Sequence, residues 1–96
     1  MITGIFKIDL LIHDAFSLKD KRQVIKSIIE RLKSRFNLSI SEVGKNDIWN
    51  RSIIGISVVS NDAAHIDSML SNIASFVEHD SRVEILDTFV DKLHYE

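Results

Sequence analysis

The sequence predicts an α+β fold in which two helices cover one face of a four-stranded antiparallel sheet. Two observations predict it. Strand-like and helix-like hydrophobic periodicities follow one another in the order βαββαβ, and the chain has 96 residues, 45% of them hydrophobic. A chain of this length buries one small core, so residues 1–96 are expected to form a single domain.

The first two elements are expected to be a strand over residues 2–13 and a helix that begins at Leu18. Hydrophobic residues occupy alternate positions of the first segment, as in a half-buried strand. Ser17 can cap the helix, and Asp20 three residues later completes a pattern close to a capping box. Asn37 is expected to end the helix. The inward stripe has helical spacing and consists of Leu18, Ile25, Ile28, Ile29, Leu32 and Phe36.

Two β-rich segments, residues 38–43 and 52–60, are expected to form a hairpin with a long connection over residues 44–51. Asn61 or Asp62 can cap a second helix, and Asp80 with Ser81 should end it. Its inward residues are Ile66, Met69, Leu70, Ile73, Phe76 and Val77. The last strand runs from residue 83 to about 90, and its pattern leaves open which face is buried.

With right-handed crossovers, this order closes into a ferredoxin-like βαββαβ sandwich with strand order 4-1-3-2. The sheet face without helices is expected to show residues from the first and third strands: Ile5, Lys7, Asp9, Leu11, Ile53, Gly55, Ser57 and Val59. These residues include no exposed aromatic side chain on which an RNA base could stack. The hydrophobic members of this face suggest that a second subunit, or the loop that carries Trp49, covers it; they are Ile5, Leu11, Ile53 and Val59.

Charge is segregated along the chain although the net charge is only −2. Residues 61–96 carry two basic and eight acidic side chains, whereas residues 17–36 carry two acidic and seven basic ones. The candidate phosphate contacts in the first helix are Lys19, Lys21, Arg22, Lys26 and Lys33. The alternative is an ordinary solvated helix face whose charge is offset by acidic residues of the second helix.

Catalytic and metal-binding patterns are absent from the sequence. There is no cysteine, and the four histidines lack the spacing that would place two rings on one metal ion. The three glycines form no phosphate-binding loop, and no nucleophile-elbow motif occurs. We therefore expect a protein that is not an enzyme and needs no metal or cofactor. No hydrophobic run can span a bilayer, which indicates a cytoplasmic protein.

Trp49 is the only tryptophan and lies in the polar connection beside Arg51. It is either a lid over the edge of the core, the reading that we favour, or an anchor for a partner.

Several segments together resemble the YlxP-like family of small bacterial proteins, a domain of unknown function. These segments are Ser17-Leu18-Lys19-Asp20-Lys21-Arg22, Phe36-Asn37, Glu42-Val43, Trp49 and Val58-Val59-Ser60-Asn61-Asp62. The resemblance implies a ferredoxin-like fold and a bacterial cytoplasmic protein. It also implies, through genes that often neighbour those of family members, a part in translation or small-subunit maturation. It supplies no catalytic residue.

Two functional hypotheses follow. The first is a non-catalytic RNA- or ribosome-associated module that contacts phosphates through its first helix, with Trp49 and Arg51 adding a stacking contact. The alternative is a homodimeric interaction module that uses the open sheet face, around Ile5, Leu11 and Ile53, or an edge strand.

Overall fold

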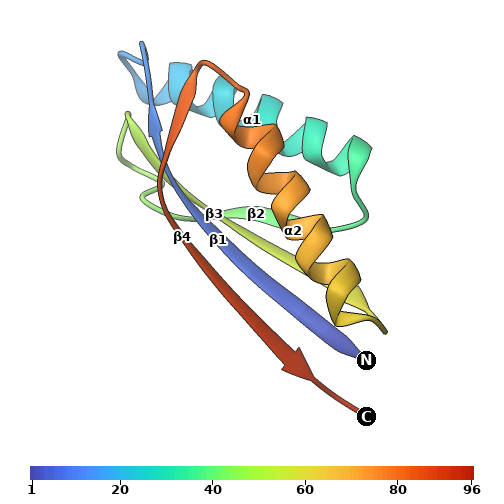
Figure 1. The fold of residues 1–96 in the computed structure, drawn as a ribbon. Coiled ribbons are helices and arrows are strands. Elements are labelled where there is room, and N and C mark those ends of the chain that lie inside the picture. Colours follow the sequence, from blue (N-terminus) through green and yellow to red (C-terminus); the bar gives the residue numbers. More distant parts are fainter.

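The computed structural model describes all residues from Met1 to Glu96, and its six elements follow the predicted order (Figure 1). They are β1 (Ile2–Ile12), α1 (Leu18–Arg35), β2 (Ser39–Gly44), β3 (Arg51–Ser60), α2 (Ala63–Glu78) and β4 (Val83–His94). All neighbouring strands are antiparallel, and the sheet order is β2-β3-β1-β4, which is the predicted 4-1-3-2 read from the other edge. The predicted α+β ferredoxin-like topology is therefore confirmed.

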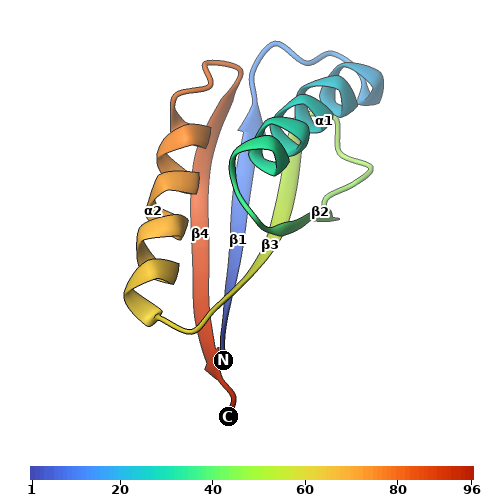
Figure 2. The same cartoon turned by 90° about the vertical axis from the view of Figure 1, so that its right-hand side faces the viewer.

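Both helices lie on the same side of the sheet, and the two chain ends lie side by side where β1 begins and its edge-strand neighbour β4 ends (Figures 1 and 2). The core fills the space between these two layers. Its sixteen buried hydrophobic residues include Ile8 and Leu10 of β1, Ile28 and Leu32 of α1, and Ile73 of α2. Neither helix has the length and hydrophobicity needed to cross a membrane.

Local capping explains where both helices begin. The Ser17 hydroxyl accepts a hydrogen bond from the Asp20 amide, as predicted, and the Asp20 carboxylate accepts one from the Phe16 amide, one residue before the cap, so the pattern is close to a capping box without being identical to it. Asp62, rather than Asn61, caps α2 by accepting from the Ala64 amide. The predicted end of α1 at Asn37 is wrong, because the last helical residue is Arg35 and the backbone of Phe36 is already extended.

A bulge in β4 explains why its buried face could not be predicted. Ile85 pairs with Leu10 and Asp87 pairs with Asp9, so one extra residue separates them on β4. The extra residue shifts the alternation of side chains. Val83 and Ile85 face the helices before the bulge, whereas Phe89 beyond it lies opposite Lys7 on the other face. The strand also extends to His94, beyond its predicted end near residue 90.

Candidate functional site

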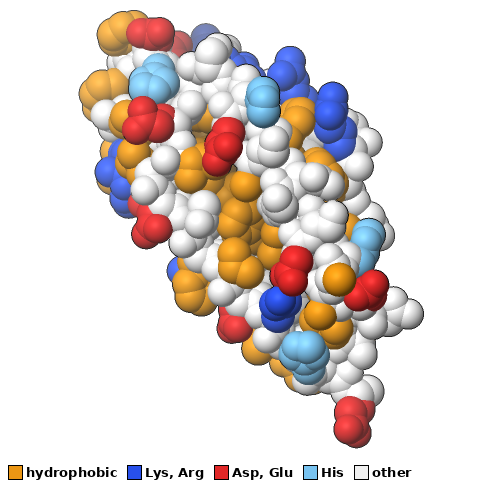
Figure 3. Space-filling view, viewed as in Figure 1, with side chains coloured by type: hydrophobic (Ala, Val, Ile, Leu, Met, Phe, Trp, Pro, Cys, Tyr) orange, Lys and Arg blue, Asp and Glu red, His pale blue; other side chains and the backbone are white.

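The outer flank of α1 carries a continuous set of exposed cations. Lys19, Arg22, Lys26 and Lys33, called here the basic row, are all exposed, and none of them forms an ion pair. Their spacing of three, four and seven residues keeps them within a narrow arc of the helix. Figure 3 views the molecule from the side of α2 and shows that Lys and Arg side chains lie over α1 on that side as well. The structure therefore brings four of the five predicted phosphate-contacting residues onto one surface.

Lys21, the fifth predicted contact, does not belong to that surface, and this prediction is wrong. Its side chain is 0% exposed and points into the protein. The ammonium group donates hydrogen bonds to the carbonyl oxygens of Lys45 at 3.0 Å, Asn46 at 2.9 Å and Arg51 at 3.3 Å. It also lies 3.2 Å from a Glu42 carboxylate oxygen. A buried ammonium needs such partners, so Lys21 anchors the β2–β3 connection and is unavailable to a ligand.

Trp49 lies in this anchored connection and remains 48% exposed. Because nearly half of its surface stays accessible, the interpretation of Trp49 as a lid over the edge of the core finds no support. The main chain around it is held at both ends. Lys21 binds the carbonyls on one side, and the Asn50 carbonyl accepts from the Ile12 amide at 2.9 Å on the other. The fold thus presents an exposed tryptophan on a fixed loop.

Arg51 turns onto the open sheet face and forms an ion pair there. Its guanidinium donates to both Asp9 carboxylate oxygens, at 2.9 and 3.0 Å, and Lys45 approaches the same carboxylate at 3.4 Å. Burial of Asp9 acts to raise its pKa, but the hydrogen bonds and charges of Arg51 and Lys45 outweigh burial and lower it. Because Asp9 holds the guanidinium, the expected stacking of Arg51 with a ligand beside Trp49 finds no support in this arrangement.

The open sheet face, formed by the side chains of the sheet that point away from the helices, contains a hydrophobic area. Ile5, Leu11 and Ile53 lie on this face, as predicted, and each of them is half-buried. Phe89 on β4 is 50% exposed, and the Lys7 ammonium lies 4.9 Å from the centre of its ring. The expectation of a face without exposed aromatics is therefore incomplete, because the β4 bulge brings Phe89 to it.

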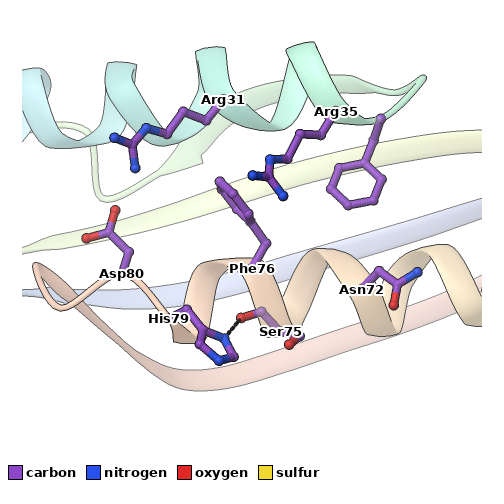
Figure 4. A pocket seen from close by; sticks show the side chains of 8 residues that line it. Arg31, Arg35, Asn72, Ser75, Phe76, His79 and Asp80 are labelled. Carbon is purple, nitrogen blue, oxygen red and sulfur yellow. Dashed lines mark hydrogen bonds between the residues drawn. The ribbon is translucent and has the colours of Figure 1, made fainter.

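A groove of about 580 Å³ lies between α1 and α2, on the flank of α1 opposite the basic row (Figure 4). This interhelical groove is lined by Arg31, Arg35, Phe36, Asn72, Ser75, Phe76, His79 and Asp80. Sequence reasoning counted the two arginines as basic residues of α1 but assigned them no site. The signal available was their spacing of four residues, on the flank of α1 that faces away from Lys19 and Lys33. No group of three or more His, Asp or Glu side chains converges in a way that could hold a metal ion.

Comparisons with known proteins identify the family of this chain and support its fold. The model of a family described as "Protein of unknown function (DUF503)" matches residues 3–90. The "Uncharacterized protein YlxP" of Bacillus subtilis (strain 168) is 37% identical over 81 residues, which cover 84% of this chain and 88% of that protein.

Three solved structures share the fold at low sequence identity. The de novo designed protein Foldit4 matches over 100% of both chains with a TM-score of 0.57 and 14% identity. A dimeric ferredoxin-like protein from an uncultured marine organism matches over 100% of this chain and 99% of its own, with a TM-score of 0.54 and 9% identity. HapK from Hahella chejuensis matches over 95% and 90%, with a TM-score of 0.52 and 16% identity. These similarities support the fold.

Proposed function

We propose that this chain, which belongs to the YlxP-like DUF503 family of proteins of unknown function, is a non-catalytic cytoplasmic module that binds RNA or the ribosome. The contact surface is the basic row of α1. The observation that carries this proposal is that four lysine and arginine side chains are exposed together without any carboxylate partner. A set of unpaired cations attracts a polyanion, because each phosphate that they neutralise releases a condensed counterion.

The geometry of α1 suits a phosphate backbone. From Lys19 to Lys33 the helix rises about 21 Å, which is long enough for several consecutive phosphates of one strand. The net charge of the chain is −2, so general attraction to nucleic acid would be weak and binding would depend on local clusters of cations such as this one. The neighbouring translation genes that the family resemblance implies favour RNA over DNA as the polyanion.

Co-sedimentation with small ribosomal subunits and fluorescence anisotropy with single-stranded RNA, each over a salt series, test this proposal. The variant Lys19→Gln/Arg22→Gln/Lys26→Gln removes three charges from the basic row. It should bind at least about tenfold more weakly, and the slope of log affinity against log salt should become shallower by about 2 for three lost phosphate contacts.

A matched control variant makes the same change in net charge at positions outside α1. Asn61, Ser71 and His94 are exposed and lie outside α1, so replacing all three with glutamate should leave RNA affinity close to that of the wild type. A folded basic-row variant that binds RNA as the wild type does would refute the proposal, as would a wild type that binds no RNA at low salt.

A second candidate function is homodimerisation through the open sheet face. Val59 and Phe89 are at least half exposed on this face, and no helix covers it. Lys7 and the acidic Asp87 and Asp91 lie on the same face, so a second copy related by two-fold symmetry can match opposite charges as well as hydrophobic area. The dimeric ferredoxin-like protein found by structural comparison is compatible with this arrangement.

Sedimentation equilibrium distinguishes a homodimer from a monomer in solution. Ile53→Lys replaces a hydrophobic side chain of the face with a charged one and should convert dimers into monomers. Phe16→Lys is the control, because Phe16 is 83% exposed in the β1–α1 loop, away from this face. A wild type that stays monomeric at high concentration would exclude the homodimer.

A further inference from the structure

The interhelical groove is a concave surface whose wall carries two arginine side chains. Arg31 and Arg35 lie one helical turn apart on α1 and extend their guanidinium groups toward α2 (Figure 4). Neither guanidinium donates a hydrogen bond or forms an ion pair within the protein. Two guanidinium groups that share one groove and have free donors are suited to an oxyanion that accepts several hydrogen bonds at once.

The only carboxylate in the groove wall is already neutralised. Asp80 accepts hydrogen bonds from the Arg82 side chain at 2.7 and 2.9 Å and from the Arg82 amide at 3.0 Å. Arg82 makes all of these hydrogen bonds, and its hydrogen bonds and charge, with a smaller contribution from the charge of Arg31, hold the pKa of Asp80 below its ordinary value although burial acts to raise it. The charge that a ligand meets in the groove is therefore positive.

The other groove residues restrain the Arg35 side chain and add a hydrogen-bond donor and hydrophobic area. The Arg35 guanidinium lies 4.8 Å from the centre of the Phe76 ring, a contact that restricts where the side chain can point. His79 Nδ1 lies 2.6 Å from the Ser75 carbonyl oxygen, which positions the ring at the rim of the groove. Asn72 adds an amide donor, and Phe36 with Phe76 adds hydrophobic area.

From this combination we propose that the groove binds a nucleotide through its phosphate, with Arg31 and Arg35 on the phosphate oxygens and the phenylalanine side of the groove against the base. Paired guanidinium groups favour phosphate over a halide or a single carboxylate, and aromatic area favours a nucleoside phosphate over inorganic phosphate. The inference rests on the proposed RNA-binding function for one source of that phosphate, which would be a nucleotide of a strand that crosses the exposed face of α1 from the basic row to the groove. A free nucleotide is the other source of the same chemistry.

Amide chemical shifts in NMR spectra provide a direct test with three probes: 5′-AMP, inorganic phosphate and a short single-stranded RNA. In the wild type, 5′-AMP should shift the amides of Ser75, Phe76 and His79 saturably, and inorganic phosphate should do so at least tenfold more weakly. Arg31→Gln/Arg35→Gln should weaken 5′-AMP binding at least tenfold. Arg35→Lys keeps the charge but loses the planar fork, so it should recover only part of that affinity.

The matched control is Asn61→Glu/Ser71→Glu, which makes the same change in net charge at exposed positions outside the groove. It should bind 5′-AMP as the wild type does. Equal weakening in the control and in the double arginine variant would overturn the proposal, because the effect would then come from net charge rather than from the groove.

The outcomes separate this inference from the proposed function. If the wild type binds RNA, the double arginine variant binds it equally well and 5′-AMP leaves the groove amides unshifted, the groove inference is overturned and the basic row stands. If 5′-AMP shifts the groove amides but the wild type binds no RNA, the groove inference is supported with a free nucleotide as its ligand, and the RNA-binding function is refuted.

Discussion

Replacing Lys21 with methionine tests whether this residue anchors the β2–β3 connection or only adds charge to α1. Methionine keeps most of the length and the hydrophobic part of the side chain but removes the ammonium group. The carbonyl oxygens of Lys45, Asn46 and Arg51 would each lose a donor, and the Glu42 carboxylate would lose the cation 3.2 Å away. We therefore expect Lys21→Met to lower stability strongly, whereas the same replacement of an exposed lysine on α1 would hardly change it.

The size of the loss follows from the burial of the two partners. Removing one member of a buried ion pair costs about 3–5 kcal/mol, because the other charge is left without compensation. Glu42 is 18% exposed and accepts a hydrogen bond from Ser52, so water and that hydroxyl relieve part of the penalty. We therefore expect Lys21→Met to lower the free energy of unfolding by about 3 kcal/mol, near the lower end of that range. Glu42→Gln in the same chain should recover part of the loss, since it removes the uncompensated charge.

Urea denaturation followed by tryptophan fluorescence measures both effects, because Trp49 is the only tryptophan and lies in the anchored connection. The Lys21→Met variant should unfold at a lower urea concentration, and acrylamide should quench its native emission more strongly as the loop loosens. Lys19→Met is the control, because Lys19 is exposed on the same helix and should cost no more than about 0.5 kcal/mol. A Lys21 variant that matches this control in stability and quenching would refute the anchoring role.

Two further predictions concern packing and pH. Gly4→Ala should cost about 1–3 kcal/mol by overpacking, because a Cβ at Gly4 would lie 2.6 Å from Ile66 Cγ2 and 3.0 Å from Val58 Cγ2, and an unchanged urea midpoint would contradict this. The Arg82 hydrogen bond, opposed by burial, holds the pKa of Asp80 below its ordinary value. The ionised Asp80 carboxylate therefore stabilises the folded protein at pH values above the ordinary aspartate pKa of about 4, and this stabilisation is lost as the pH falls through the lower pKa that Asp80 has in the folded state. Urea midpoints between pH 5 and 2 should fall more steeply in the wild type than in Asp80→Asn, and parallel curves would show that the pair does not contribute.

Periodicity and capping predicted the elements well because both are local properties of the chain. Ser17 and Asp20 hold the start of α1 through hydrogen bonds between residues three and four positions apart. In β1, the hydrophobic residues that alternate in the sequence are the ones whose side chains are buried in the structure. β4 was harder to predict, because its bulge lies where the strand pairs with Asp9 and Leu10, about 75 residues away in sequence. The position of Phe89 on the open sheet face depends on that bulge.

Three features of this protein follow from the sequence alone: the order of the elements, the hydrophobic stripes that build the core, and the concentration of seven basic residues in residues 17–36. Only the tertiary structure decided what each cation does. It buried Lys21 under carbonyls 24 to 30 residues away, left Lys19 free at the surface, and turned Arg31 toward α2 to line a groove. The physical reason is that the cost of a charge depends on the partners that surround it, and those partners come from parts of the chain that meet only when it folds.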